Sequence, residues 1–349
     1  KMISSKNEFA LQSAVKQLEG SVSKYIQQIR EQILYEMGRI ESALDDPEHY
    51  DLTGYSDELF DKTEQQIVSL QRLLDRFENG RMKSEGINTV IVGKPNAGKS
   101  SLMNILLDED RAIVTDIAGT TRDAIDTEIV HNGKEYIFID TAGLRRKNKI
   151  KEELERYSII RTVSAVERAD VVLMVIDATE GVTEQDAKIA GIAHERGKGV
   201  IIVVNKWDAI EKNDKTMREY EKEVRRVLSF MPYAEIMYVS ALTGQRLPKL
   251  YDMIDMVIEN QTLRIATGVL NEIMTEAVAM QQPPSDKGKR LKLYYITQVA
   301  VKPPTFVIFV NDKNLMHFSY TRYLENKIRE AFGFKGTSLK FIIRERKED

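Results

Sequence analysis

Residues 93–100, Gly-Lys-Pro-Asn-Ala-Gly-Lys-Ser, constrain the fold of this chain more than any other segment. They fit a phosphate-binding-loop pattern, in which two glycines, a lysine and a hydroxyl residue stand at fixed spacing. An apolar run at 87–92 precedes the octapeptide, and an apolar helical pattern at 102–106 follows it. The segment therefore predicts a strand, a glycine turn and a helix, whose backbone N–H groups point at phosphate oxygens.

The sequence predicts three residues that hold Mg²⁺, one in the phosphate-binding loop and one in each of two later loops. Ser100 supplies the hydroxyl ligand of the phosphate-binding loop, whereas Lys99 is expected to reach the β- and γ-phosphates. Asp140 opens Asp-Thr-Ala-Gly after the apolar run 136–139, and a carboxylate at the end of a strand suits a second-shell Mg²⁺ ligand. Thr121, in Gly-Thr-Thr-Arg-Asp at 119–123, is favoured over Thr120 as the switch I threonine that contacts the metal.

Two more loops predict which base the site accepts. Asp208 ends Asn-Lys-Trp-Asp at 205–208, directly after the apolar run 200–204. Its carboxylate can accept hydrogen bonds from N1–H and the exocyclic amine of guanine, which adenine does not supply, so the element specifies GTP. Ser240-Ala241-Leu242 follows the apolar run 236–239 and is expected to offer a backbone amide to guanine O6. With these four elements in this order, the chain resembles the translation-factor-like GTPases.

The catalytic part of the site departs from the Ras-like pattern. Leu144 stands where Ras-like enzymes have the glutamine that orients the attacking water, so water must be positioned by other means. Asn96 resembles the asparagine of GTPases that bind K⁺ beside the β- and γ-phosphates, where a cation stabilises developing charge; the alternative is that Asn96 only braces the loop. Arg145 and Arg146 are either charge stabilisers or solvated residues that contact a partner.

The complete set of predicted site residues has three overlapping groups. The nucleotide-binding residues are Gly93, Asn96, Ala97, Gly98, Lys99, Ser100, Ser101, Asn205, Lys206, Asp208, Ser240, Ala241 and Leu242. The metal ligands are Ser100, Thr121, Asp140 and Asn96, and the catalytic residues are Lys99, Thr121, Asn96 and Gly143.

Composition excludes some other kinds of chemistry. The chain has no cysteine, which excludes disulfides, thiolate catalysis and cysteine metal sites within it and is compatible with a reducing compartment. No apolar run approaches the length of a membrane-spanning helix, and no signal peptide is visible. We therefore expect a cytoplasmic protein without a membrane partner.

The periodicity divides the chain into three domains. Residues 1–86 repeat apolar positions at helical spacing, with a break at Asp45-Asp46-Pro47, and predict a long α-helical hairpin. Residues 87–261 alternate strand and helix, as an α/β doubly wound sheet of a P-loop GTPase does. Residues 262–349 predict an α-β-β-α-β unit with a three-stranded sheet, a KH-like α+β domain in outline.

The third domain is also the basic end of the chain. By count it carries about six more basic than acidic residues, whereas 1–86 carries about five more acidic ones, an asymmetry that hints at nucleic-acid contact. Its Gly-x-x-Gly at 333–336 joins a helix to a strand, unlike the RNA-clamping loop of KH domains, and is expected to be a simple turn. RNA contacts are expected instead from basic side chains, namely Lys289, Arg290, Lys292, Arg322 and Arg329.

Longer segments resemble two families of GTPases. From about residue 126 the chain is similar to the second G domain and KH-like domain of the ribosome-assembly GTPases EngA/Der, on DTAGLRRKNKIKEELERYS (140–158), EQDAKIAGIAHERGKGVIIVVNKWDAI (184–210), QVAVKPPTFVIFVND (298–312) and MHFSYTRYLENKIREAFGFKGT (316–337). Residues 1 to about 125 resemble the helical domain and early G domain of the tRNA-modification GTPases MnmE/TrmE, on FALQSAVKQLEGSVSKYIQQIREQIL (9–34) and RAIVTDIAGTTRDAI (111–125). The chain therefore reads as a possible chimera, natural or engineered.

The resemblance implies GTP/GDP, Mg²⁺ and K⁺ as ligands and a role as a nucleotide switch in large ribosomal subunit assembly. It implies ribosomal RNA as partner of the KH-like domain, and a possible homodimer through the hairpin or the G domains. Two alternative functions are a subunit for tRNA wobble-uridine modification and a nucleotide-binding helical scaffold with negligible hydrolysis. MnmE-type proteins carry a cysteine tail, and this chain has no cysteine, so the tRNA-modification alternative lacks one feature of that family.

Overall fold

The structure is a computed structural model that describes residues 21–46, 54–63, 65–67, 70, 86–109, 117–118, 125–139, 154–286 and 288–345. It divides into two compact units, Lys1–Gly86 and Ile87–Asp349. The predicted G domain and KH-like domain both lie in the second unit, and their boundary near 261 stays a prediction. Among the described residues, no helix is long and apolar enough to span a membrane.

The first unit contains the predicted helical hairpin. Helix α2 runs over Ser21–Asp45 and ends at the predicted break, and residues 55–63 and 65–67 are helical after Gly54. The two segments are antiparallel, because Gln66 Nε2 donates to Gln32 Oε1 at 3.1 Å while Arg39 Nη1 donates to Glu58 Oε1 at 3.3 Å.

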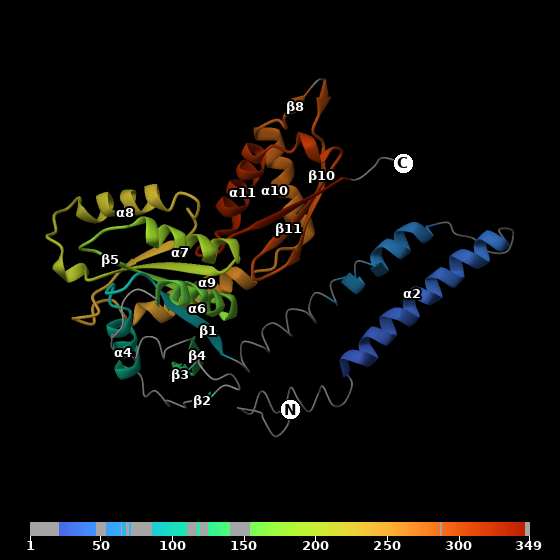
Figure 1. The fold of residues 1–349 in the computed structure, drawn as a ribbon. Helices are drawn as coiled ribbons and strands as arrows, with labels where there is room; N and C mark the ends of the chain where they lie inside the picture. The colour runs from blue at the N-terminus through green and yellow to red at the C-terminus, as the bar shows by residue number, and fades with distance from the viewer. Residues whose placement is uncertain are drawn as a thin grey trace. The chain divides into compact units, whose positions relative to one another are not determined.

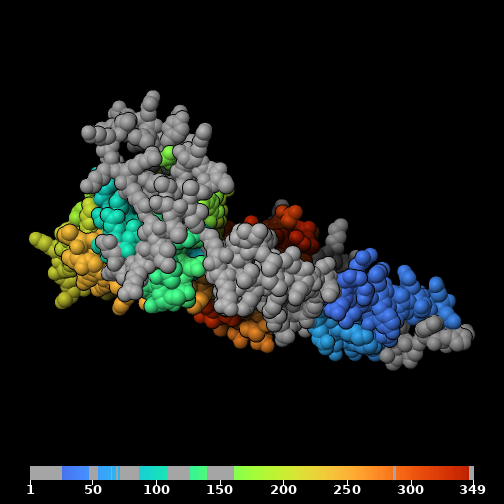
Figure 2. Space-filling view, turned by 90° about the horizontal axis from the view of Figure 1, so that it is seen from below, coloured from blue at the N-terminus to red at the C-terminus, as the bar shows by residue number. Residues whose placement is uncertain are grey.

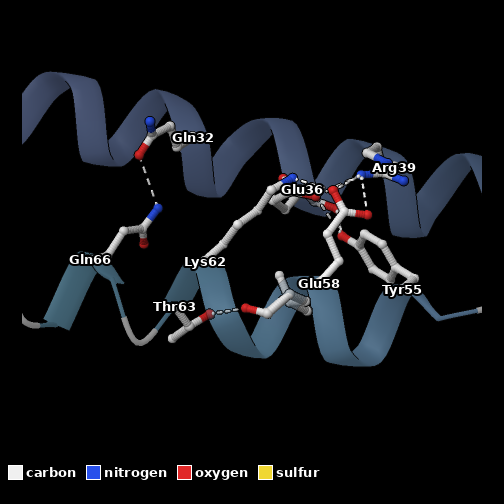
Figure 3. Close-up of polar contacts among 9 residues, drawn as sticks. Gln32, Glu36, Arg39, Tyr55, Glu58, Lys62, Thr63 and Gln66 are labelled. Carbon is white, nitrogen blue, oxygen red and sulfur yellow. Dashed lines mark hydrogen bonds and ion pairs between the residues drawn. The ribbon is translucent and has the colours of Figure 1, made fainter.

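A buried carboxylate holds the two helices of the hairpin together (Figure 3). Glu36 accepts from Tyr55 Oη at 2.8 Å and from Lys62 Nζ at 2.7 Å, and these hydrogen bonds, that of Lys62 first, lower the pKa of Glu36. On the surface of α2, several large apolar side chains remain exposed, including Leu34 at 52% and Leu44 at 74%. In space-filling form, α2 and the helical residues that follow Gly54 lie against each other (Figure 2).

A seven-stranded sheet forms the G domain, in the order β2-β3-β4-β1-β5-β6-β7. The strands are β1 Ile87–Val92, β2 Ile117–Ala118, β3 Ile125–His131, β4 Lys134–Ile139, β5 Val171–Asp177, β6 Gly199–Asn205 and β7 Glu235–Tyr238. β4, β1, β5, β6 and β7 are parallel, and β3 and β2 add an antiparallel edge. β5 and β6 are buried along their whole length, as central strands covered on both faces are.

Helices cover both faces of this sheet (Figure 1). They are α4 Lys99–Glu109, α6 Leu154–Arg168, α7 Glu184–Glu195, α8 Thr216–Val227 and α9 Lys249–Thr262, with a short 3-10 turn η1 at Trp207–Ala209. One core joins α6, α7 and α8 to alternate residues of β1, β5 and β6, whereas α9 packs against β5 and β6. The predicted doubly wound α/β class is confirmed.

The KH-like domain also has the predicted order. Helix α10 (Thr267–Met280) precedes strands β10 (Leu293–Ala300) and β11 (Thr305–Val310), and helix α11 (Phe318–Phe332) precedes strand β12 (Lys340–Glu345). β10 pairs antiparallel and β12 parallel with β11. The periodicity did not predict the small hairpin of β8 (Ser285–Asp286) and β9 (Lys289–Arg290) or the 3-10 turn η2 (Lys313–Leu315).

The Gly-x-x-Gly loop at 333–336 packs this domain against the G domain. Gly336 N donates to Tyr233 O at 2.8 Å, and Gly336 O accepts from Val200 N at 2.8 Å. Gly336 has φ +74°, and a Cβ there would lie 2.2 Å from Val257 Cγ2. The loop is therefore more than the simple turn expected from its position, because it docks one domain on the other.

Candidate functional site

The phosphate-binding loop leaves Val92 at the end of β1 and enters α4 at Lys99. Gly93 has φ +145°, and a Cβ on it would lie 2.3 Å from the backbone oxygen of Val175. Gly98 has φ +90°, and its Cβ would lie 2.2 Å from Asn205 Nδ2. Both positions accept only glycine, since the backbone is in the left-handed half of φ space and no room exists for a side chain. The two glycines thus keep open the concave turn that the motif predicted.

Lys99 already bends over this turn. Its Nζ donates to Gly93 O and, at 2.7 Å, to Lys94 O. Burial lowers the pKa of Lys99 to about 8, and the Asp186 carboxylate opposes that effect. An ammonium held by backbone carbonyls in a desolvated turn is suited to an anionic ligand, which would favour its charged form.

Asn96 occupies the left-handed region at φ +65° and is exposed. Asparagine tolerates this conformation better than most residues, so the backbone alone gives a reason for asparagine here. The exposed carboxamide leaves the K⁺ prediction open. Ser100 and Ser101, in the first turn of α4, are exposed at the same end of the helix.

Asn205 connects the phosphate loop to both base-binding loops. Its Nδ2 donates to Ala97 O at 2.9 Å, and its Oδ1 accepts from Ala241 N at 2.9 Å. The residue is buried at the end of β6. The sequence predicted Asn205 as a nucleotide ligand; the structure shows it as the tie between three loops.

Lys206 is positioned by a carboxylate that none of the sequence motifs indicated. It lies at φ +59°, and its Nζ donates to Asp177 Oδ2 at 2.5 Å. Asp177 also accepts from the Thr179 hydroxyl at 2.7 Å. Burial would raise the pKa of Asp177, but the hydrogen bonds from Lys206 and Thr179 outweigh it, and the pKa is lowered. Asp177 is the single acid of the run 171–177 and stands at its end, and this was the sequence signal that could have indicated its role.

On the base-selecting side of the site, Asp208 and Leu242 are exposed, whereas Ser240 is buried. Asp208 lies in the first turn of η1 and is exposed, while its neighbour Trp207 is buried. Ser240 is buried, and its Oγ accepts from Leu242 N at 3.3 Å and Thr243 N at 3.1 Å, which fixes the turn of the second loop. Leu242 is 85% exposed, so packing gives no reason for an apolar residue there.

Some predicted residues lie outside the described part of the chain. These are Thr121, Asp140 and Gly143, together with Leu144, Arg145 and Arg146. Where the chain is described, no group of three or more His, Asp or Glu side chains could hold a metal ion. The predicted Mg²⁺ site, with Ser100 as a ligand, stays a prediction, because Mg²⁺ takes few protein ligands and completes its shell with phosphates and water.

One predicted RNA contact is wrong. Arg329 Nη1 donates to Phe334 O at 2.9 Å and Thr337 O at 3.1 Å, and its guanidinium lies 5.0 Å from the ring centroid of Tyr233. It also pairs with Glu325 at 2.8 Å. Arg329 therefore holds the interdomain loop. The remaining candidates, namely Lys289, Arg290, Lys292 and Arg322, are exposed.

Two segments of the chain match known family models. Residues 88–206 match the model described as a 50S ribosome-binding GTPase. Residues 264–344 match the model described as the KH-domain-like C-terminal part of EngA bacterial GTPase enzymes.

Curated relatives agree with these models. The chain is 77% identical over 259 residues to the GTPase Der of Agathobacter rectalis and 78% identical over 259 residues to that of Lachnoclostridium phytofermentans. Each alignment covers 74% of this chain and 59% of the relative, so the chain spans less than two thirds of the relatives it matches. The resemblance of residues 1 to about 125 to MnmE/TrmE stays a prediction.

Proposed function

We propose that this chain is a GTPase of the EngA/Der type, which binds GTP and hydrolyses it to GDP and phosphate; the matches of both domains to family models and the 77% identity to a GTPase Der support this proposal. The observation that carries the proposal is the glycine cradle at 93–98 with Lys99 across it, tied by Asn205 to the two base-binding loops. A single asparagine thereby fixes the phosphate-binding and base-binding sides relative to each other.

Each part of the site has a distinct task. Backbone N–H groups of the loop and of the α4 N-terminus bind phosphate oxygens, and Lys99 balances the charge of the β- and γ-phosphates. Ser100, with Thr121 and Asp140, would hold Mg²⁺, which neutralises charge that develops on the phosphates. Asp208 selects guanine, and Lys206, anchored on Asp177, supports the same loop. Gly143 is proposed to offer its backbone N–H to the γ-phosphate.

A monovalent cation is the proposed substitute for an arginine finger. Asn96 lies in the phosphate-binding loop and is exposed, and a K⁺ ion beside it would stabilise charge that appears in the transition state. Because Leu144 replaces the water-orienting glutamine, this electrostatic contribution matters more than in Ras-like enzymes.

Asn96→Gly is expected to abolish K⁺ stimulation of GTP hydrolysis. Glycine accepts φ +65° without strain, so the variant removes the carboxamide and keeps the backbone. We expect wild-type turnover to be faster in KCl than in NaCl by about tenfold or more, and Asn96→Gly to bring this ratio near unity. Asn132→Gly is the control, since Asn132 has φ +50° in the turn between β3 and β4. A K⁺/Na⁺ ratio that is the same in wild type and Asn96→Gly contradicts the proposal.

The cellular role proposed is a nucleotide switch in assembly of the large ribosomal subunit, with the KH-like domain in contact with ribosomal RNA. Support comes from the family models of both domains and from the 77% identity to a GTPase Der. A ribosomal target would place the protein in the cytoplasm.

Sedimentation with ribosomal particles tests this role. Loaded with a non-hydrolysable GTP analogue, the chain is expected to pellet with large-subunit particles, and to remain in the supernatant when loaded with GDP. Lys99→Ala, which lacks the phosphate-binding ammonium, is expected to give no nucleotide response. Association that is absent, or equal in both nucleotide states, contradicts the role.

The alternatives make different predictions. A helical scaffold predicts negligible hydrolysis in both K⁺ and Na⁺ buffers, and a tRNA-modification subunit predicts co-purification with a flavoprotein. A homodimer through the hairpin or G domains stays a prediction, motivated by the exposed apolar side chains of α2 such as Leu34 and Leu44.

A further inference from the structure

The KH-like domain uses one of its surfaces to dock on the G domain. Gly336 and Arg329 contact Tyr233, and Lys302 Nζ pairs with Asp170 Oδ1 at 3.2 Å, with both side chains about nine-tenths buried at 11% exposure. The Gly-x-x-Gly loop at 333–336 lies in this interface, where Phe334 and Gly336 are buried and Lys335 is exposed. Most of the loop is therefore covered, and another surface of this domain is better suited to an RNA contact.

The sheet of the KH-like domain has one face covered by helices and an opposite face that is exposed in part. Helices α10 and α11 lie on one side of it (Figure 1), where Ile296, Ile308 and Phe306 join the core. Side chains alternate between faces along a strand. Tyr295, Phe309 and Ile342 therefore belong to the opposite face, and all three are partly exposed. On the same face, Val307 and Thr305 are buried at 3% and 7% exposure.

Strand register places a cation and two aromatic rings in one row on the opposite face, where it is exposed. Tyr295 pairs with Phe309 across β10 and β11, and Phe309 pairs with Arg344 across β11 and β12. The two rings stack with centroids 4.3 Å apart and planes 15° from parallel. The next cation along β12 is Lys340, four residues and about 13 Å away. These four residues are called the stacking face below.

The charge of the stacking face has one sign. Strand register assigns residues to this face from Tyr295 and Ala300 on β10 to Arg344 and Lys340 on β12. None of them is acidic. Lys340 and Arg344 are exposed, and neither forms an ion pair with another residue that the structure describes. Exposed cations beside aromatic rings suit a polyanion with planar bases better than a protein surface, which would need acids to match them.

We propose that the stacking face binds single-stranded RNA: a base extends the Tyr295–Phe309 stack and the backbone phosphates pair with Arg344 and Lys340. The inference rests on the proposed RNA contact of the KH-like domain and names its surface and its ligand. Stacking accepts any base, because every base has a π-face, so the site is selective for unpaired strands rather than for sequence.

Binding of labelled oligouridylate to the full chain, followed by fluorescence anisotropy, tests the inference. Tyr295→Leu and Phe309→Leu keep an apolar side chain and are expected to weaken binding about tenfold each. Arg344→Gln and Lys340→Gln are each expected to reduce the slope of log affinity against log salt by about 0.7. The matched control is Lys327→Gln, which removes one positive charge from α11 on the other side of the sheet; binding should be retained. The pair Lys289→Gln and Arg290→Gln tests the β9 hairpin as the competing RNA contact.

Several outcomes overturn the inference. They are wild-type affinity in the Leu and Gln variants, loss of binding only in the β9 variants, and equal affinity for duplex and single-stranded RNA. Capture of a ribosomal protein that the stacking-face variants lose, with oligouridylate binding intact, also overturns it in favour of a protein partner. Arg344→Gln lies at an exposed edge position, so it tests the face even if an aromatic variant fails to fold.

The same variants separate this inference from the proposed cellular role. Nucleotide-dependent pelleting with large subunits, together with normal RNA binding by the variants, removes the stacking face and keeps the role. Oligouridylate binding that depends on the stacking face, without any pelleting, keeps the face and removes the role.

Discussion

Asp208→Asn is expected to transfer the base preference of the site from guanine to xanthine. The carboxylate accepts from guanine N1–H and the exocyclic amine, whereas an amide presents one donor and one acceptor, which match the C2 carbonyl and N–H of xanthine. Two hydrogen bonds to a charged group contribute about 3–6 kcal/mol, so GTP affinity should fall on the order of 10²–10⁴-fold. Competition between labelled GTP and XTP measures the change.

Asp214→Asn is the control for this exchange. Asp214 is exposed in the loop that follows η1, so the control removes one negative charge near the site without touching the base. It is expected to leave GTP affinity unchanged. GTP affinity that is retained in Asp208→Asn would show that the base is chosen elsewhere.

Gly98→Ala is expected to cost the chain its nucleotide affinity while it remains folded. The new Cβ would lie 2.2 Å from Asn205 Nδ2 at φ +90°, so the asparagine has to leave Ala97 O and Ala241 N. The phosphate loop and the base loop then lose their common support, and a displacement of about 1 Å in such a site costs about 10²-fold. Titration with fluorescent GTP, together with thermal melting, measures both effects.

Gly191→Ala separates loop geometry from the general effect of a methyl group. Gly191 lies in α7 with open space where its Cβ would be, and alanine favours a helix by about 1 kcal/mol over glycine. This variant should bind GTP normally and melt no earlier than wild type. Normal GTP affinity in Gly98→Ala contradicts the account of the cradle.

The sequence predicted the elements that local pattern determines. The octapeptide at 93–100 predicted the turn between β1 and α4, and the apolar pattern at 171–177 predicted the strand that the structure shows as β5. The α-β-β-α-β order of the KH-like domain followed from its periodicity in the same way. These features depend on neighbours in sequence, so one chain is enough to read them.

Residues whose role depends on distant contacts were the ones missed or misassigned. Asp177 supports Lys206 from the neighbouring strand, 29 residues away. Arg329 looked like a surface cation until the 333–336 loop folded back on Tyr233. Asn205 matched a motif for base binding, yet its two hydrogen bonds reach across 108 and 36 residues to other loops. Such pairings are not encoded in local spacing.

The central claim is that the cradle at 93–100 and Asp208 together form one site for a guanine nucleotide. Equilibrium titration of the full chain with fluorescent guanosine and adenosine triphosphates in the presence of Mg²⁺ tests it most directly. The account predicts saturable binding of the guanosine nucleotide, with the adenosine nucleotide weaker on the order of 10²-fold or more. Equal affinity for the two, or no binding of either, would contradict it.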